Sequence, residues 1–409
     1  MSTTTRKLPG VPLKALALAA SLAAAAAAHA EDRPWYIGAS QAFTHDSNVF
    51  RTVGSRTADT ISSTSVLGGL DLNPGRQHLY LDAIASRNRF NKLDQLNNDS
   101  HSISGGLDWE TVEHLSGHLR ATSRQNLTDY TVIGTPEVKN IEKIQTASAG
   151  IRYGFTSVLG VEGRVEHRKV DLSVSNERDS TQRVGSLGLR YDPGGQLTFG
   201  TAVRVTKGDT PLYAPLLPLD VVPVPTLGPV EPDEMDRKDI DFTVNWVPSG
   251  LSKVHGRISL SRENHTAPSR GDFHGVSGAV TWEYEATGKT KIRSSLIRDT
   301  GNETSFLALE RLGLTNLRFD NNRLNWVALV EADWAATAKI LVNGSFRYIR
   351  GTLDTATGSN FNSNTTKIGL SARYVPTRAV ALGCNIGHEQ GSNSFRSDVF
   401  GCFGQFVIQ

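Results

Sequence analysis

The sequence predicts an all-β fold, a transmembrane antiparallel up-and-down β-barrel of about 18 strands, with 16 strands as the alternative. Three observations predict it: an N-terminal leader, a two-residue alternation of apolar and polar side chains, and connections that are alternately short and long. Hydrophobic residues make up only 38% of the chain. This fits a barrel, because its strands alternate lipid-facing with lumen-facing residues.

The N-terminus has the pattern of a secretory signal peptide. Basic residues Arg6 and Lys7 precede an alanine-rich apolar run that ends in "AHA" at Ala28–Ala30. This order of basic, apolar and small residues predicts cleavage after Ala30. The expected organisation is a signal peptide over 1–30 and an outer-membrane barrel over 31–409, and no later segment approaches the ~20 consecutive apolar residues of a membrane helix.

Strand positions follow from the alternation. In the segment 102–110, Ile103 and Leu107 fall on one face, and Ser104 and Asp108 fall on the other. Successive side chains of a strand point to opposite faces, so this segment predicts a strand with one apolar side. The same rhythm predicts strands at about 35–43, 62–73, 77–89, 100–110, 115–126, 143–155, 158–169, 181–192, 196–207, 237–247, 252–263, 273–284, 288–299, 322–334, 338–349, 365–375, 379–389 and 398–408.

The connections between these strands alternate in length. Short turns such as "NPGR" at 73–76 and "PSG" at 248–250 are followed by longer polar loops such as 127–142. Short periplasmic turns and long extracellular loops are typical of bacterial outer-membrane barrels. An even number of strands then places both termini in the periplasm.

Aromatic residues gather where strands enter the short turns. They share the apolar face of their strands, and they are Trp109, Tyr153, Tyr191, Trp246, Trp282, Tyr284, Trp334 and Tyr374. Tyrosine and tryptophan have an apolar body and a polar edge, so a ring of them predicts the girdle at the periplasmic membrane boundary. In a soluble β-sandwich, the alternative, core aromatics would be scattered along the strands.

The polar face of the strands is expected to line the lumen. By strand parity the lining contains Arg120, Arg124, Arg152, Arg164, Arg168, Arg190, Arg204, Arg257, Arg293, Arg347 and Arg373, with Asp82, Asp108, Glu110, Glu162, Glu166, Asp241, Glu283, Glu331 and Asp333. Two interpretations stay open. The arginines either offer weak contacts to the carboxylate and hydroxyl groups of a sugar polymer, or form cross-strand ion pairs that satisfy buried charges.

The segment 208–236 differs from the other predicted loops. It is apolar and proline-rich, which disfavours long regular strands. It is either a plug, lid or docking element, or a surface loop.

Cys384 and Cys402 lie on the last two predicted strands, almost opposite each other and on the apolar face. Either they form a cross-strand disulfide, which the geometry of a hairpin allows, or they are two lipid-facing thiols. Their spacing predicts no metal site.

The sequence offers little support for an enzyme. It contains no nucleophile elbow, phosphate-binding loop or zinc-helix motif, so we expect neither catalytic residues nor a cofactor. The formal net charge of +2, together with export, gives no reason to expect nucleic acid as a partner.

Two stretches, "FTHDSNVFR" at 43–51 and "ADTISSTSVLGGLDLNPGRQHLYLDAIASRNRF" at 58–90, resemble the EpsL-type outer-membrane proteins of exopolysaccharide operons. The matching positions are Asp46, Asn48, Phe50, Arg51, Asp59, Thr60, Ile61, Leu81, Asp82 and Ala83. The likeness covers about the first hundred mature residues. One departure is the C-terminus, where Gln409 stands in place of the aromatic residue that commonly ends a barrel.

The resemblance implies a passive outer-membrane channel that exports a newly synthesised exopolysaccharide. The implied partners are the exopolysaccharide, outer-membrane lipid, and a periplasmic polysaccharide co-polymerase or other export components. Two alternatives stay open: a nutrient-uptake porin, and a surface barrel that transports nothing.

Overall fold

The computed structural model describes residues 33–128, 130, 137–214, 228–300, 324–354, 360–391 and 395–409. Its strands are β1 (Trp35–Asp46), β2 (Asp59–Leu72), β3 (His78–Phe90), β4 (Asn98–Glu110), β5 (Leu115–Leu127), β6 (Ile141–Gly154), β7 (Leu159–Leu172), β8 (Ser180–Tyr191), β9 (Leu197–Tyr213), β10 (Glu231–Ser249), β11 (Ser252–His265), β12 (Phe273–Thr287), β13 (Thr290–Asp299), β14 (Leu324–Ala335), β15 (Ile340–Asp354), β16 (Asn360–Thr377), β17 (Val380–Gly391) and β18 (Arg396–Ile408). Two 3-10 turns, η2 (Asp94–Leu96) and η3 (Asn176–Arg178), interrupt the described loops. No helix within the described ranges is long and apolar enough to cross a membrane.

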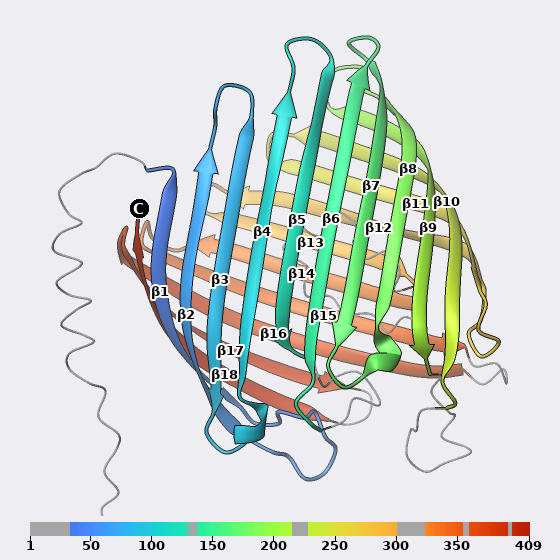
Figure 1. The fold of residues 1–409 in the computed structure, drawn as a ribbon. Helices are drawn as coiled ribbons and strands as arrows, with labels where there is room; N and C mark the ends of the chain where they lie inside the picture. The colour runs from blue at the N-terminus through green and yellow to red at the C-terminus, as the bar shows by residue number, and fades with distance from the viewer. Residues whose placement is uncertain are drawn as a thin grey trace, which may run out of the picture.

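The strands form one closed antiparallel sheet. Each strand pairs with its neighbours in the chain, and β1 pairs with both β2 and β18, so that Ala39 lies opposite Val66 on one side and Phe406 on the other. Figure 1 shows β1–β9 as the near wall, with the later strands crossing behind them. The prediction of an 18-stranded up-and-down barrel is confirmed.

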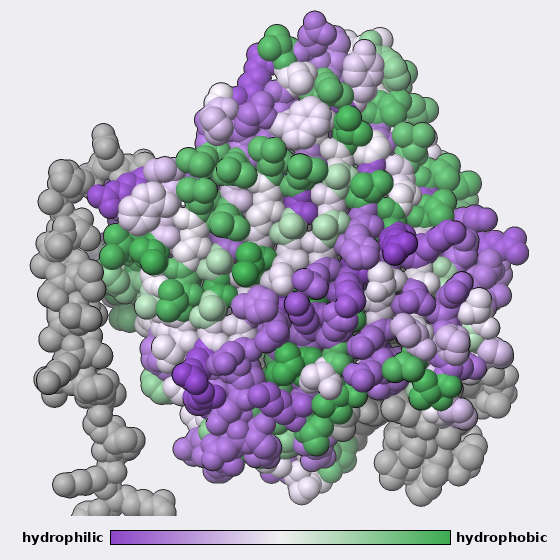
Figure 2. All heavy atoms as spheres, in the orientation of Figure 1, coloured by the Kyte–Doolittle hydropathy of each residue, from purple (hydrophilic) through white to green (hydrophobic). Residues whose placement is uncertain are grey.

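The direction of the side chains follows the alternation in the sequence. On β9, Val203 is 59% exposed, whereas the next residue, Arg204, is 1% exposed. On β11 the same contrast separates exposed Ile258 from buried Ser259. In a closed barrel, the exposed apolar residues face lipid and the polar residues face the lumen. Figure 2 shows apolar residues covering the upper part of the near wall, with hydrophilic residues below.

The aromatic residues of the predicted girdle lie at the short-turn ends of their strands and share the outward-facing parity. Prolines accompany two of them where the strand pairing slips. The β10–β11 register shifts between Trp246 and Ser249, around Pro248, and the β16–β17 register shifts between Tyr374 and Thr377, around Pro376. Proline has no N–H to donate to a ladder, so it is tolerated where regular pairing ends.

The short turns depend on glycine. In the "PGG" turn, Gly194 has φ of 82° and Gly195 has φ of 97°, values in the left-handed region that L-residues rarely adopt. These turns lie at the upper end of the barrel in Figure 1, and η2 and η3 lie at the lower end. We assign the short-turn end, which also holds both ends of the sheet, to the periplasm.

The proline-rich segment 208–236 differs from its prediction as a loop. Strand β9 continues to Tyr213 and β10 begins at Glu231, so both ends of the segment are strands. The register shifts between Glu231 and Asp233, which places Pro232 in a bulge where its missing N–H costs no ladder bond. Residues 215–227, on which the predicted plug, lid or docking element falls, lie outside the described ranges.

Candidate functional site in the barrel lumen

The predicted lumen residues all have the inward parity of their strands, and most of them stand next to apolar side chains of the outer face. On β5, for example, Arg120 follows the outward-facing Leu119, and on β15 Arg347 follows the outward-facing Phe346. Several remain in contact with solvent inside the barrel. The side chains of Arg120 and Arg164 are 27% and 29% exposed. The lumen therefore admits water beside these charged groups.

Strands β5 and β7 together carry a group of guanidinium groups, which we call the basic wall: Arg120, Arg124, Arg164 and Arg168. Arg164 donates from Nη2 to the Oε2 of Glu166 at 2.7 Å. Arg168 lies within electrostatic range of Arg124, and these two positive charges repel each other. Carboxylates lie among these arginines: Arg120 is 3.5 Å from Asp108, and Arg168 lies within electrostatic range of Glu166 and Glu142. This part of the lumen is therefore a mixed-charge surface that presents several guanidinium donors.

The next part of the wall carries a buried network on β9–β11, which we call the constriction cluster: Arg204, Arg237, Asp239, Asp241 and Glu263. Arg204 donates to both carboxylate oxygens of Asp241, from Nε at 2.9 Å and from Nη2 at 3.0 Å. Arg237 donates from Nε to Asp239 at 2.9 Å and from Nη1 to Glu263 at 2.8 Å. Bidentate, charge-assisted bonds of this kind hold the side chains in one geometry.

The constriction cluster reaches β13. The Nη1 of Arg237 donates to the Oγ1 of Thr300 at 2.7 Å, just beyond the end of β13. The buried Asp299 lies within electrostatic range of Arg168 on β7 and Arg257 on β11. Since β7 and β13 are not neighbours in the sheet, charged groups from separate parts of the wall face one another at this level.

An apolar patch lies beside these charged groups. Ile297, Val327 and Leu329 have inward parity on β13 and β14, and each is at most 1% exposed. Ile297 and Val327 are direct partners in the β13–β14 register. These three side chains are therefore packed inside the protein beside the charged cluster and are not open to the lumen water.

A second polar cluster lies on β10 and β11, on the extracellular side of the part of these strands that faces the membrane. The outward apolar residues of these strands end at Ile240 and Leu260, and the outward Asp236 and Lys238 follow. Beyond that level, His265 lies 2.9 Å from a carboxylate oxygen of Asp233 through Nδ1 and 2.9 Å from Glu263 through Nε2.

The charges in this second cluster support one another. Burial lowers the pKa of His265, but its hydrogen bonds with Asp233 and Glu263 outweigh burial and raise the pKa above its usual value. Burial raises the pKa of both carboxyl groups, but hydrogen bonds from His265 and the charges of Arg270 and Arg237 lower the pKa of Asp233 and of Glu263 to about 2. The imidazolium is thus held between two carboxylates.

The residues behind the resemblance to EpsL-type proteins form a structural motif at the extracellular mouth. Asn48 is fully buried and donates from Nδ2 to the carbonyl of Thr52 at 2.8 Å and to that of Arg396 at 3.0 Å. Arg51 donates to Asp46 at 2.7 Å and to Glu389 at 3.0 Å. These contacts fasten the loop after β1 to β17 and β18, where the barrel closes.

The same loop contributes to a small apolar cluster of Val49, Phe50, Phe90, Leu96 and Tyr130. Phe50 and Tyr130 meet edge to face, with ring centroids 5.1 Å apart. Asp59 accepts hydrogen bonds from the backbone N–H groups of Lys92 and Leu93, which fixes the neighbouring loop. The apolar residues of this cluster and Asp59 are therefore explained by the packing and hydrogen bonding of the mouth loops.

Cys384 and Cys402 are direct register partners on β17 and β18, and a disulfide joins them. They share the outward parity of Leu382 and Phe400. Within the described part of the chain, no three His, Cys, Asp or Glu side chains are grouped so that they could hold a metal ion.

Sequence reasoning missed several members of the two polar clusters, namely Arg237, Asp239, Glu263 and His265. It also missed Asp299, which lies near the first of them. Arg237 and Asp239 have the parity of Asp241, so the alternation on β10 was sufficient to find them. Glu263, His265 and Asp299 lie at or beyond the ends of the predicted strands, where the alternation alone does not show whether a residue still belongs to the wall.

No protein-family model matches the sequence. No curated protein matches it either. Solved structures of Pseudomonas aeruginosa proteins are similar in fold. OpdL aligns at 12% identity over 92% of this chain and 98% of its own, with a TM-score of 0.46. The outer membrane protein OpdK aligns at 11% identity over 91% and 98%, with a TM-score of 0.43. OccK2 (OpdF) in complex with glucuronate aligns at 10% identity over 92% and 98%, with a TM-score of 0.46.

These findings contradict the resemblance to EpsL-type proteins. The structures reported above are Opd and Occ proteins, one an outer membrane protein and one solved in complex with glucuronate. The expected export of exopolysaccharide is therefore wrong, as are the exopolysaccharide and the periplasmic co-polymerase as partners. The motif that suggested them is a packing motif of the mouth loops. The fold and its apolar outer surface define a β-barrel of the bacterial outer membrane.

Proposed function

We propose that the protein is a non-enzymatic channel through which small hydrophilic solutes diffuse across the outer membrane into the cell. The observation that carries the proposal is the closed barrel of 18 strands whose inward arginines, such as Arg120 and Arg164, still keep more than a quarter of their surface exposed. Barrels of 16–18 strands leave room for an aqueous channel.

The guanidinium donors of the lumen favour small anions as solutes. The basic wall places four guanidinium groups along the lumen, and guanidinium binds carboxylate through paired hydrogen bonds. A small organic acid with one carboxylate matches these donors.

Swelling of liposomes that contain the purified protein tests the proposal. We expect faster swelling with a small monocarboxylate than with a neutral sugar or an amine of similar size. The double substitution Arg120→Gln with Arg124→Gln reduces the charge of the basic wall and is expected to lower the preference for the carboxylate several-fold.

The matched control is Arg262→Gln with Arg350→Gln, which removes two exposed arginines of outward parity. We expect it to leave the solute preference unchanged. Liposomes that fail to swell with any of the three solutes contradict a channel. Equal swelling with all three solutes, or equal effects of the two double variants, contradicts the proposed anion preference.

A further inference from the structure

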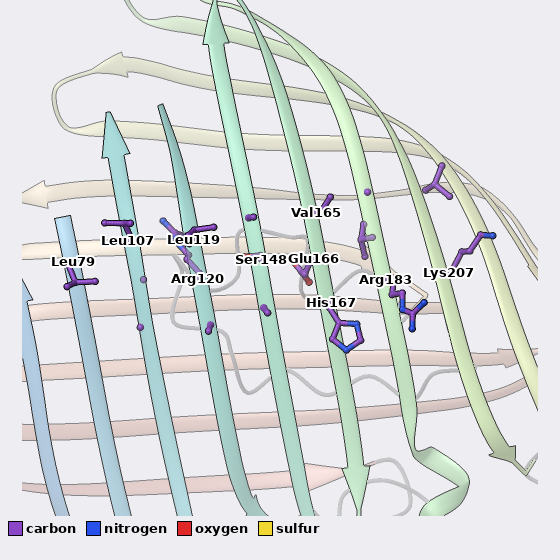
Figure 3. Close-up of a pocket in the computed structure, with 18 residues that line it drawn as sticks. Leu79, Leu107, Leu119, Arg120, Ser148, Val165, Glu166, His167, Arg183 and Lys207 are labelled. Atoms are coloured by element: carbon purple, nitrogen blue, oxygen red, sulfur yellow. The ribbon is translucent and has the colours of Figure 1, made fainter. Parts of the chain in front are cut away.

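Three basic side chains form a row on the outer surface of the barrel. His167 on β7, Arg183 on β8 and Lys207 on β9 are direct register partners across neighbouring strands. All three are exposed and share the outward parity of Val165, Leu187 and Val205. Figure 3 shows them side by side on the near wall. We call this set the basic row.

The basic row borders a groove with a volume of about 930 Å³ on the outer surface of β3–β9. Its apolar lining includes Leu107, Leu119 and Val165, which Figure 3 shows beside the row. The positions between them carry small residues. Gly105, Ala121 and Ala147 continue the line of His167 across β4–β6 in register.

The basic row lies near the extracellular edge of the apolar band. On β8, Arg183 is separated from the girdle residue Tyr191 by Gly185, Leu187 and Leu189 on the outward face. At ~3.3 Å per residue and a strand tilt of about 40°, Arg183 lies roughly 20 Å from Tyr191 along the membrane normal. A barrel's apolar band is about 25 Å tall. The next outward residues beyond the row are the polar Lys169, Thr181 and Asp209, so the row lies close to the headgroups of the outer leaflet.

No ion pair engages the three basic residues within the described part of the protein. The nearest acidic partner in register, Asp236 opposite Lys207, has its carboxylate 3.9 Å from the ammonium of Lys238. The basic row therefore presents donors to the membrane rather than completing an internal network.

From this geometry we infer that the outer surface binds a phosphorylated lipid of the outer leaflet. The phosphate is bound by His167, Arg183 and Lys207, and an acyl chain lies in the groove. Arginine and lysine donate charge-assisted hydrogen bonds to phosphate. The apolar groove on the periplasmic side of the row fits the attached acyl chain. The site is separate from the lumen, so it does not depend on the proposed channel activity.

Native mass spectrometry of the purified protein in detergent, titrated with diphosphorylated lipid A, tests the inference. We expect the wild type to bind this lipid at least about tenfold more tightly than lipid A stripped of its phosphates. The double variant Arg183→Gln with Lys207→Gln is expected to lose about tenfold in affinity, which corresponds to about 1.4 kcal/mol. Millimolar inorganic phosphate is not expected to compete, because it lacks the acyl chain.

Two further variants sharpen the test. Arg262→Gln with Arg350→Gln removes the same amount of outward charge elsewhere and is expected to keep wild-type affinity. Gly185→Leu adds a side chain to the groove at a position where a Cβ meets no atom within 4 Å, so it fits the fold. We expect it to weaken lipid binding by filling the groove while solute permeation stays normal.

Equal affinity for the phosphorylated and the phosphate-free lipid would overturn the inference. So would an equal loss in both double variants, or full competition by inorganic phosphate. A β-sheet circular-dichroism spectrum like that of the wild type shows that the Arg183→Gln with Lys207→Gln variant is folded. Unchanged lipid binding by that folded variant counts against the proposed site.

Discussion

The substitution Asp241→Asn tests whether the constriction cluster stabilises the barrel. Asp241 is buried in the lumen wall and accepts two hydrogen bonds from Arg204, at 2.9 and 3.0 Å, together with one from Ser259. Asparagine has nearly the same shape but no charge and only one acceptor oxygen. The variant therefore leaves the buried guanidinium of Arg204 with one carboxylate, that of Asp239 at 3.2 Å.

The expected loss follows from these contacts. Breaking a buried ion pair by changing one partner costs about 3–5 kcal/mol. Arg204 keeps its contact with Asp239, and the amide oxygen of the new side chain still accepts one hydrogen bond. We therefore expect the lower end of that range, a decrease of about 3 kcal/mol in the free energy of unfolding.

Urea titration in detergent micelles, followed by tryptophan fluorescence, measures this decrease. The matched control is Asp333→Asn, which removes an inward carboxylate that is exposed near the short turns and accepts a single bond from Asn343 at 2.8 Å. We expect the control to change stability by less than about 0.5 kcal/mol. The reasoning is refuted if Asp241→Asn unfolds at the same urea concentration as the wild type, or if both variants lose the same stability.

The remaining predictions concern pH, the disulfide and the leader. The folded-state pKa of His265 is raised, so its stabilisation is complete below the ordinary histidine pKa of about 6.5 and is lost as pH rises through the folded pKa. The wild type should therefore exceed His265→Gln in stability most at about pH 5–6 and least at high pH, by urea titration at each pH; an advantage that grows with pH contradicts this. Replacing Cys384 and Cys402 by alanine should lower the free energy of unfolding by about 3 kcal/mol, because the disulfide joins residues 18 positions apart and so restricts the unfolded chain. The replacement should leave permeation unchanged. Mass spectrometry of the mature protein should show an N-terminus directly after Ala30, and an intact leader would contradict cleavage there.

The fold was predictable because the barrel requires a period of two residues in every strand. A lipid-facing residue such as Val203 must be apolar, and its neighbour Arg204 must serve the lumen, so the pattern is local in the sequence. The turns were equally local, since glycines such as Gly194 and Gly195 mark positions of positive φ. The same parity predicts which arginines point into the lumen.

The arrangement of the site was less predictable, because it depends on strands that are distant in sequence. Arg237 meets Glu263 through the β10–β11 register and Thr300 beyond the end of β13, and neither distance follows from spacing. The motif around Asn48 shows the opposite difficulty. Its residues form a recognisable pattern, but they stabilise the mouth loops, so a likeness in this pattern carries no information about the transported solute.

Single-channel recording in planar bilayers tests most directly whether the barrel encloses a continuous water path. With the purified protein in a gradient of potassium chloride, we predict discrete conductance steps and a reversal potential that indicates preference for chloride. A folded protein that inserts into the bilayer but produces no conductance would contradict this account.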